Sequence, residues 1–107
     1  MQALPLKMYI RFLEVIQLDL DSLLNNLNDS AFFKHNAPMT QGFILNLRLS
    51  YSDQNCDGFL QILSDLQNEF PCLYKKDSNK VALLTHMKTL VRDLLEVLTD
   101  RAESGDE

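Results

Sequence analysis

Two stretches of the chain repeat apolar residues at intervals of three and four, and this spacing constrains the fold more than any other feature. The first stripe consists of Tyr9, Leu13, Ile16, Leu20, Leu23 and Leu27. The second consists of Val81, Leu84, Met87, Val91, Leu94 and Leu98. Such spacing places the side chains on one face of a helix that packs against other helices. The sequence therefore predicts long helices near residues 5–27 and 78–101.

The segment between these stripes predicts two further helices. Residues 57–70 carry Phe59, Ile62, Leu63, Leu66 and Phe70 at helical spacing, and Pro71 ends this helix because the residue before a proline is pushed out of the helical region. Residues 40–52 fit a helical face through Phe43, Ile44, Leu47 and Tyr51, but they also alternate as a strand would. A single strand has no partner here, so we predict a helix.

Composition agrees with a helical domain. The chain has 107 residues, of which 46% are hydrophobic, so it can bury a core without a metal or disulfides. Three glycines and three prolines are few for a loop-rich or all-β protein. We predict an all-α fold, a compact four-helix bundle with long first and last helices. It forms a single domain over residues 1–101, and residues 102–107 form an acidic, disordered tail.

The predicted core takes its residues from three of the four helices. It contains Leu13, Ile16, Leu20, Leu23, Leu63, Leu66, Leu84, Met87, Val91 and Leu94. Two linkers join the helices: residues 31–40, which contain the adjacent Phe32 and Phe33, and residues 71–79, in which Asp77 or Ser78 caps the last helix. Adjacent aromatic residues cannot share one helical face, so one of the pair must fold back over the bundle or be available to a partner.

The charge and the cysteines limit the classes of function. A net charge of −5 argues against a surface for nucleic acid or anionic membranes. The apolar run at the N-terminus is interrupted by Lys7, Arg11 and Glu14, unlike a signal peptide, and no run is long enough for a membrane span. Cys56 and Cys72 lie at the two ends of one predicted helix, roughly 24 Å apart, so no internal disulfide is expected. We therefore expect an intracellular protein, cytoplasmic or nuclear.

No motif for catalysis or for a cofactor is present. The chain has two histidines, His35 in a predicted linker and His86 on the last helix, and no motif pairs either with a cysteine or a serine. His86 is expected to be a partly buried structural residue. We expect neither enzymatic activity nor a cofactor.

The sequence instead suggests excess apolar surface. The stripe of the last helix spreads over roughly 160°, wider than the stripe of about 100° that packing on one side requires. On the first helix, Met8, Val15 and Leu18 lie away from the main stripe. The candidate partner-binding residues are Met8, Val15, Leu18, Phe32, Phe33, Leu90 and Val97. We expect a non-enzymatic protein–protein interaction module, an adaptor or regulatory subunit, that binds a partner chain or a second copy of itself.

An alternative function comes from residues 53–58, DQNCDG, which resemble the first half of an EF-hand calcium loop. Asp53, Asn55 and Asp57 fill loop positions 1, 3 and 5, and Gly58 fills the sharp-turn position 6. Position 12 needs a bidentate carboxylate, but Ser64 stands there. The same residues also suit an ordinary turn in which Asp53 or Asp57 caps the next helix. A calcium-responsive protein with an incomplete loop at residues 53–64 is thus the second hypothesis.

Because the bidentate carboxylate is missing, calcium should bind no more tightly than about millimolar, the weak end of the range for such loops. Isothermal titration of the protein with calcium measures this directly. A saturable isotherm in the micromolar range, abolished by Asp53→Ala, would favour the calcium-responsive hypothesis over the interaction module.

Overall fold

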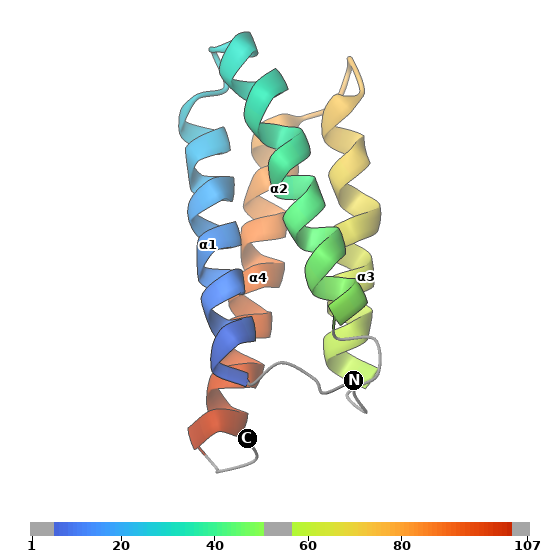
Figure 1. Cartoon of the computed structure of the whole chain (residues 1–107). Coiled ribbons are helices and arrows are strands. Elements are labelled where there is room, and N and C mark those ends of the chain that lie inside the picture. Colours follow the sequence, from blue (N-terminus) through green and yellow to red (C-terminus); the bar gives the residue numbers. More distant parts are fainter. Residues whose placement is uncertain (1–5, 51–56, 104–107) are drawn as a thin grey trace.

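The computed structural model describes residues 6–50 and 57–103, and these residues form a four-helix bundle (Figure 1). The α-helices are α1 (Leu6–Asn25), α2 (Ser30–Ser50), α3 (Asp57–Glu69) and α4 (Lys80–Glu103), and a short 3-10 helix, η1 (Phe70–Tyr74), follows α3. Successive helices run in opposite directions, and each packs against two neighbours in the order α1, α2, α3, α4 and back to α1. No strand occurs among the described residues, so the predicted all-α four-helix bundle is confirmed.

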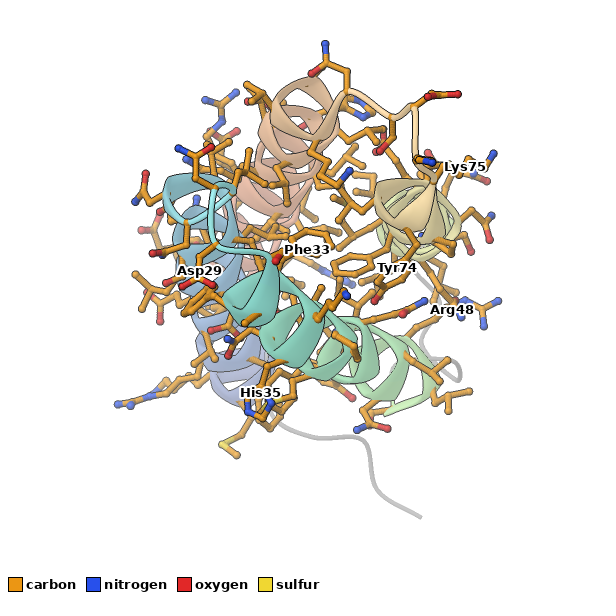
Figure 2. The ribbon with its side chains drawn as sticks, turned by 90° about the horizontal axis from the view of Figure 1, so that it is seen from above. Asp29, Phe33, His35, Arg48, Tyr74 and Lys75 are labelled. Carbon is orange, nitrogen blue, oxygen red and sulfur yellow. The ribbon has the colours of Figure 1, made fainter. Side chains whose placement is uncertain are left out.

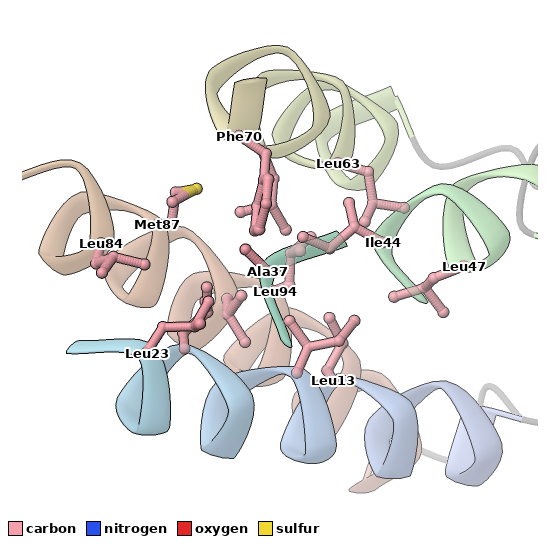
Figure 3. Close-up of a cluster of buried hydrophobic side chains, with 14 of the residues drawn as sticks. Leu13, Leu23, Ala37, Ile44, Leu47, Leu63, Phe70, Leu84, Met87 and Leu94 are labelled. Atoms are coloured by element: carbon pink, nitrogen blue, oxygen red, sulfur yellow. The ribbon is translucent and has the colours of Figure 1, made fainter. Parts of the chain in front are cut away.

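The core lies along the axis of the bundle and receives side chains from all four helices (Figure 3). All ten predicted core residues are buried. The most extensive helix contact joins α1 to α4, the two helices with the clearest heptad stripes. Since full burial of a large apolar side chain contributes about 1.5–3 kcal/mol, this core is the main source of stability.

Helix α2 begins ten residues before its predicted start, so the interpretation of residues 31–40 as a linker was wrong. The Asp29 carboxylate caps the helix by accepting a hydrogen bond from the Phe32 N–H at 3.0 Å. The buried stripe of α2 consists of Phe33, Ala37, Thr40, Ile44 and Leu47. Its spacing of four and three is as regular as that of α1, but Ala37 and Thr40 are too small or polar to mark it in the sequence.

Pro38 was the other reason to expect a linker, and it lies inside α2. A proline in a helix interior removes one hydrogen bond and commonly costs about 3 kcal/mol. Here Pro38 and Lys34, whose carbonyl loses its usual donor, are both exposed, so water can reach that carbonyl. Burial of the opposite face of α2 offsets the remaining cost.

The predicted linker at residues 71–79 is partly helical. Pro71 lies in the first turn of η1, where a proline is tolerated, and Phe70 and Leu73 are buried. Tyr74 continues over the end of the bundle, where its ring lies edge-on to Phe33 with 6.3 Å between ring centroids (Figure 2). Its hydroxyl donates a hydrogen bond to Gln41 Oε1 at 3.0 Å, which ties η1 to α2.

The start of α4 is capped by Asn79 and not by the predicted Asp77 or Ser78. The Asn79 Oδ1 atom accepts a hydrogen bond from the Ala82 N–H at 3.1 Å. At its other end α4 continues to Glu103, so the first two residues of the predicted tail 102–107 are helical. Residues 104–107 lie outside the described part of the chain.

The calcium hypothesis is only partly within the described structure. Residues 53–56, which include Cys56 and two of the predicted loop ligands, lie outside it, as does the predicted helix cap at Asp53. The other half of the motif, from Asp57, belongs to α3. Gly58 therefore lies in a helix, whereas an EF-hand loop needs it in a sharp turn.

Two truncations test the packing of α1 against α4. Leu20→Ala should lower the free energy of unfolding by about 2–5 kcal/mol, and Val91→Ala by a smaller amount, because both side chains are fully buried and leave cavities. Val81→Ala is the matched control: it makes the same chemical change on the same helix at a residue that is 55% exposed, and should change stability by less than about 0.5 kcal/mol. Denaturant unfolding measures all three, and equal effects of the two valine variants would contradict the described core.

Candidate functional site

Helix α1 carries a second row of apolar residues beside its buried stripe. This row contains Met8, Phe12 and Val15. Each of them precedes a buried residue by one position, so its side chain lies about 100° around the helix from the buried stripe. Phe12 is 42% exposed and Val15 is 47% exposed. Leu18 lies still further round and is 66% exposed. The outer part of α1 next to α2 is therefore apolar and open to solvent.

Helix α2 supplies the facing row. Met39 and Phe43, which are four residues apart, are both about half exposed. Between the two rows lies a hollow of about 400 Å³. Its lining consists of Phe12, Val15, Phe43, Asn46, Leu47 and Ser50. Three large apolar side chains from two helices thus surround one space that no described side chain fills.

The course of α2 explains why the hollow forms at this place. In Figure 1, α2 starts beside the end of α1 and runs at an incline, so that it ends near α3. The two helices therefore separate toward the start of α1, where the hollow lies. The separation is bridged by Tyr9, whose hydroxyl donates a hydrogen bond of 2.8 Å to the Ser50 carbonyl. This bond satisfies one of the last carbonyls of α2, which have no partner within the helix.

A second, smaller hollow of about 150 Å³ continues along the same pair of helices. It is lined by Asp19, Ser22, Phe32, Asn36, Met39, Thr40 and Phe43. Phe43 lines both hollows, so they are neighbours along α1 and α2, and we call the two together the α1–α2 groove. Its end near Phe12 is apolar, and its end near Asp19 is polar.

Asp19 is the one ionisable residue in the described lining of the groove. Its carboxylate makes no hydrogen bond and no ion pair with any described residue. The side-chain amide of the neighbouring Asn36 donates a hydrogen bond to the Phe32 carbonyl at 2.9 Å and none to Asp19. Burial raises the pKa of the Asp19 carboxyl above its usual value. The groove therefore presents one acidic group whose charge is not balanced within the described structure.

The charges next to the groove are mainly basic. Helix α2 has no acidic residue along its whole length, and its basic residues are Lys34, His35 and Arg48. On α1, Arg11 is exposed one helical turn before Val15. An apolar surface with a few charged residues at its edge is typical of a site of contact with another molecule.

Several predicted partner-binding residues lie at this surface. Met8, Val15 and Leu18 are exposed on α1, and Val15 lines the groove. Phe32 packs partly against the core and lines the polar end. Phe33 is different, because it is a buried core residue on the inner face of α2 and is not available to a partner.

The predicted contacts on the last helix are partly covered within the bundle. Leu90 packs against the core, and Val97 is half-buried. The wide apolar stripe of α4 is thus explained by packing against two neighbours. Val81, at the start of α4, is the member of that stripe that remains exposed.

Three exposed apolar residues of the groove were missed from the sequence: Phe12, Met39 and Phe43. Phe12 could have been found, because it follows Met8 by four residues and precedes Val15 by three. Met39 was assigned to a linker, and Phe43 was placed on the same helical face as Leu47. In the structure Leu47 is buried, but Phe43 is 45% exposed and points along the groove side of the helix.

The histidines do not form a catalytic arrangement with the described residues. His86 is exposed, not half-buried as predicted, and its Nδ1 atom lies 2.7 Å from Glu69 Oε2. Neither histidine hydrogen-bonds to a serine or cysteine of the described residues, and Cys72 is a free, half-buried thiol. Within residues 6–50 and 57–103, no group of three or more potential metal ligands comes together.

Comparison of the chain with protein-family models, with curated proteins and with solved structures found no match. No helix of the described residues is long and apolar enough to cross a membrane. The interpretation of the groove therefore depends on its own geometry and chemistry.

Asp19→Asn tests the environment of the groove carboxyl. A raised pKa means that the folded state favours the protonated carboxyl, so its contribution to stability is present at low pH and is lost as the pH rises through the folded-state pKa. Asp19→Asn should therefore raise the thermal midpoint at pH 7, and this advantage should shrink as the pH falls below the usual aspartate range.

The matched control is Glu96→Gln, which removes one negative charge from an exposed site on α4. Thermal unfolding of the three proteins across pH 3 to 8 separates the local effect from the change in net charge. A lower midpoint for Asp19→Asn at pH 7 would show that the carboxylate is stabilised in the folded protein, contrary to this interpretation.

Proposed function

We propose that this chain is a non-enzymatic helical protein–protein interaction module, an adaptor or regulatory subunit, that binds a protein partner through the α1–α2 groove. The observation that carries the proposal is the cluster of Phe12, Val15 and Phe43, three large apolar side chains, each nearly half exposed, around one hollow of about 400 Å³. Single exposed apolar residues are common on any protein, but a contiguous group around a concave site is typical of a binding surface.

Burial of the exposed apolar side chains at this surface contributes part of the free energy of binding a partner. Each large apolar side chain that becomes fully buried contributes about 1.5–3 kcal/mol before the entropic cost of association is subtracted. Here the side chains are already half covered, so each contributes about half of that amount. Met8 and Met39 extend the apolar area, and the flexible methionine side chain adapts well to a partner surface.

Polar groups in the groove support binding more than catalysis. Its described polar lining consists of Asp19, Ser22, Asn36, Thr40, Asn46 and Ser50. These groups can accept or donate hydrogen bonds, but Asp19 makes no hydrogen bond to a serine or threonine hydroxyl of the described residues that it would activate as a nucleophile. A few polar groups at the edge of an apolar hollow instead fix the orientation of a bound chain.

The double substitution Val15→Asp with Leu18→Asp tests this function. Both residues are exposed and lie off the buried stripe, so the fold should survive while two charges disrupt apolar contact. In affinity capture with mass spectrometry, partner proteins that the wild type recovers should be lost with the variant. In light scattering at high protein concentration, any self-association of the wild type should be lost in the variant. Circular dichroism confirms that the variant is folded.

Val81→Asp is the control, because it places a charge on an equally exposed apolar residue at the start of α4, outside the described groove lining. It should retain whatever the wild type binds. Identical recovery by all three proteins, with a monomer mass for each, would remove the reason for assigning function to the α1–α2 groove.

A further inference from the structure

The shape of the α1–α2 groove suits one kind of occupant. From Phe12 to Ser22 the groove follows α1 for ten residues, about 15 Å or nearly three helical turns. It lies between two antiparallel helices, and a third helix can pack into the trough between such a pair at the usual axis distance of about 8–10 Å. Binding of an extended segment by strand addition needs a sheet edge, and the described residues contain no strand.

The chemistry of the groove changes along its length. The apolar hollow around Phe12, Val15 and Phe43 comes first, and Asp19 lies one helical turn beyond Val15, about 6 Å along α1. An amphipathic helix lying in the groove would therefore place apolar side chains in the hollow and a polar side chain one or two turns later, beside Asp19. This order defines a pattern that the bound helix must carry.

The Asp19 carboxylate favours a cationic side chain of the occupant at the polar end of the groove. Asp19 has no cationic partner among the described residues. A symmetric contact in which the two Asp19 side chains of two copies meet would bring two unpaired carboxylates together in a partly desolvated interface, which is costly. A lysine or arginine from a different protein would instead form a charge-assisted hydrogen bond with Asp19.

We infer that the α1–α2 groove binds a cationic amphipathic helix of a partner protein, with its apolar residues in the hollow at Phe12, Val15 and Phe43 and a lysine or arginine against Asp19. This inference rests on the proposed function and specifies the partner's chemistry. The mode of recognition is a helix in a groove, with apolar anchors spaced by three and four residues.

The probe is a fluorescein-labelled helical peptide of alanine, leucine and lysine, about 18 residues or five turns long, with leucines spaced three and four apart and lysines beside them. A second peptide has glutamate in place of each lysine. Fluorescence anisotropy at about 0.15 M salt, which screens long-range attraction, measures the Kd of each peptide for the full chain. The lysine peptide should bind and the glutamate peptide should bind at least tenfold more weakly.

Three variants locate the binding. Asp19→Asn should raise the Kd of the lysine peptide by about threefold or more. Glu96→Gln makes the same change in net charge at an exposed site on α4 and should leave this Kd unchanged. Val15→Asp should abolish binding. This variant adds a negative charge, so non-specific attraction of a basic peptide would instead make its binding tighter.

The outcomes separate the two proposals. If both peptides bind equally and Asp19→Asn has no effect, while Val15→Asp still abolishes binding, the cationic occupant is wrong and the groove remains a binding site. If Val15→Asp leaves peptide binding unchanged or tightens it, the groove is not the site, and both proposals are overturned. If sedimentation shows a homodimer that Val15→Asp with Leu18→Asp dissociates, the occupant is a second copy, which overturns this inference but supports the interaction module.

Discussion

The packing of α1 against α4 is the contact on which the rest of this structure depends. These helices carry the two regular heptad stripes, and they form the most extensive interface in the bundle although they are farthest apart in the chain. Both helices contribute fully buried side chains, most of them leucines, to the closely packed core. An ion pair between Lys88 and Asp21 adds to the contact at its outer edge. Helices α2 and α3 then cover the remaining open side of the pair.

The groove follows from how α2 covers that side. The middle of its buried stripe contains the small residues Ala37 and Thr40, whereas the part toward its end contains the larger Ile44 and Leu47. Because the distance between helix axes depends on the side chains at the contact, α2 can lie close to its neighbours at its middle and farther from α1 at its end. Phe12 and Phe43 border this separation without filling it, and the hydrogen bond from Tyr9 to Ser50 bridges it. The same packing that closes the core thus leaves a site open beside it.

Helices with strong apolar stripes could be predicted from the sequence, and those with weak stripes could not. Every predicted core residue is buried, because leucine, isoleucine, methionine and valine at heptad spacing have one face that must leave water. The first ten residues of α2 were missed, since alanine and threonine give little periodic signal and Pro38 suggests a break. The 3-10 helix after Glu69 was missed for a related reason: Pro71 ends an α-helix but fits the first turn of a new helix.

The sequence by itself determined which residues cannot share the buried face of a helix. A turn of 100° per residue is enough to place Met8, Val15 and Leu18 away from the stripe of α1, whatever packs against that stripe. Only the tertiary structure decided which apolar residues are covered. Phe33 and Leu90 are covered by helices distant in the chain, while Phe12 and Phe43 remain exposed at the separation between α1 and α2. Local spacing fixes the direction of a side chain, but burial depends on neighbours that the chain supplies from elsewhere, and spacing alone does not reveal them.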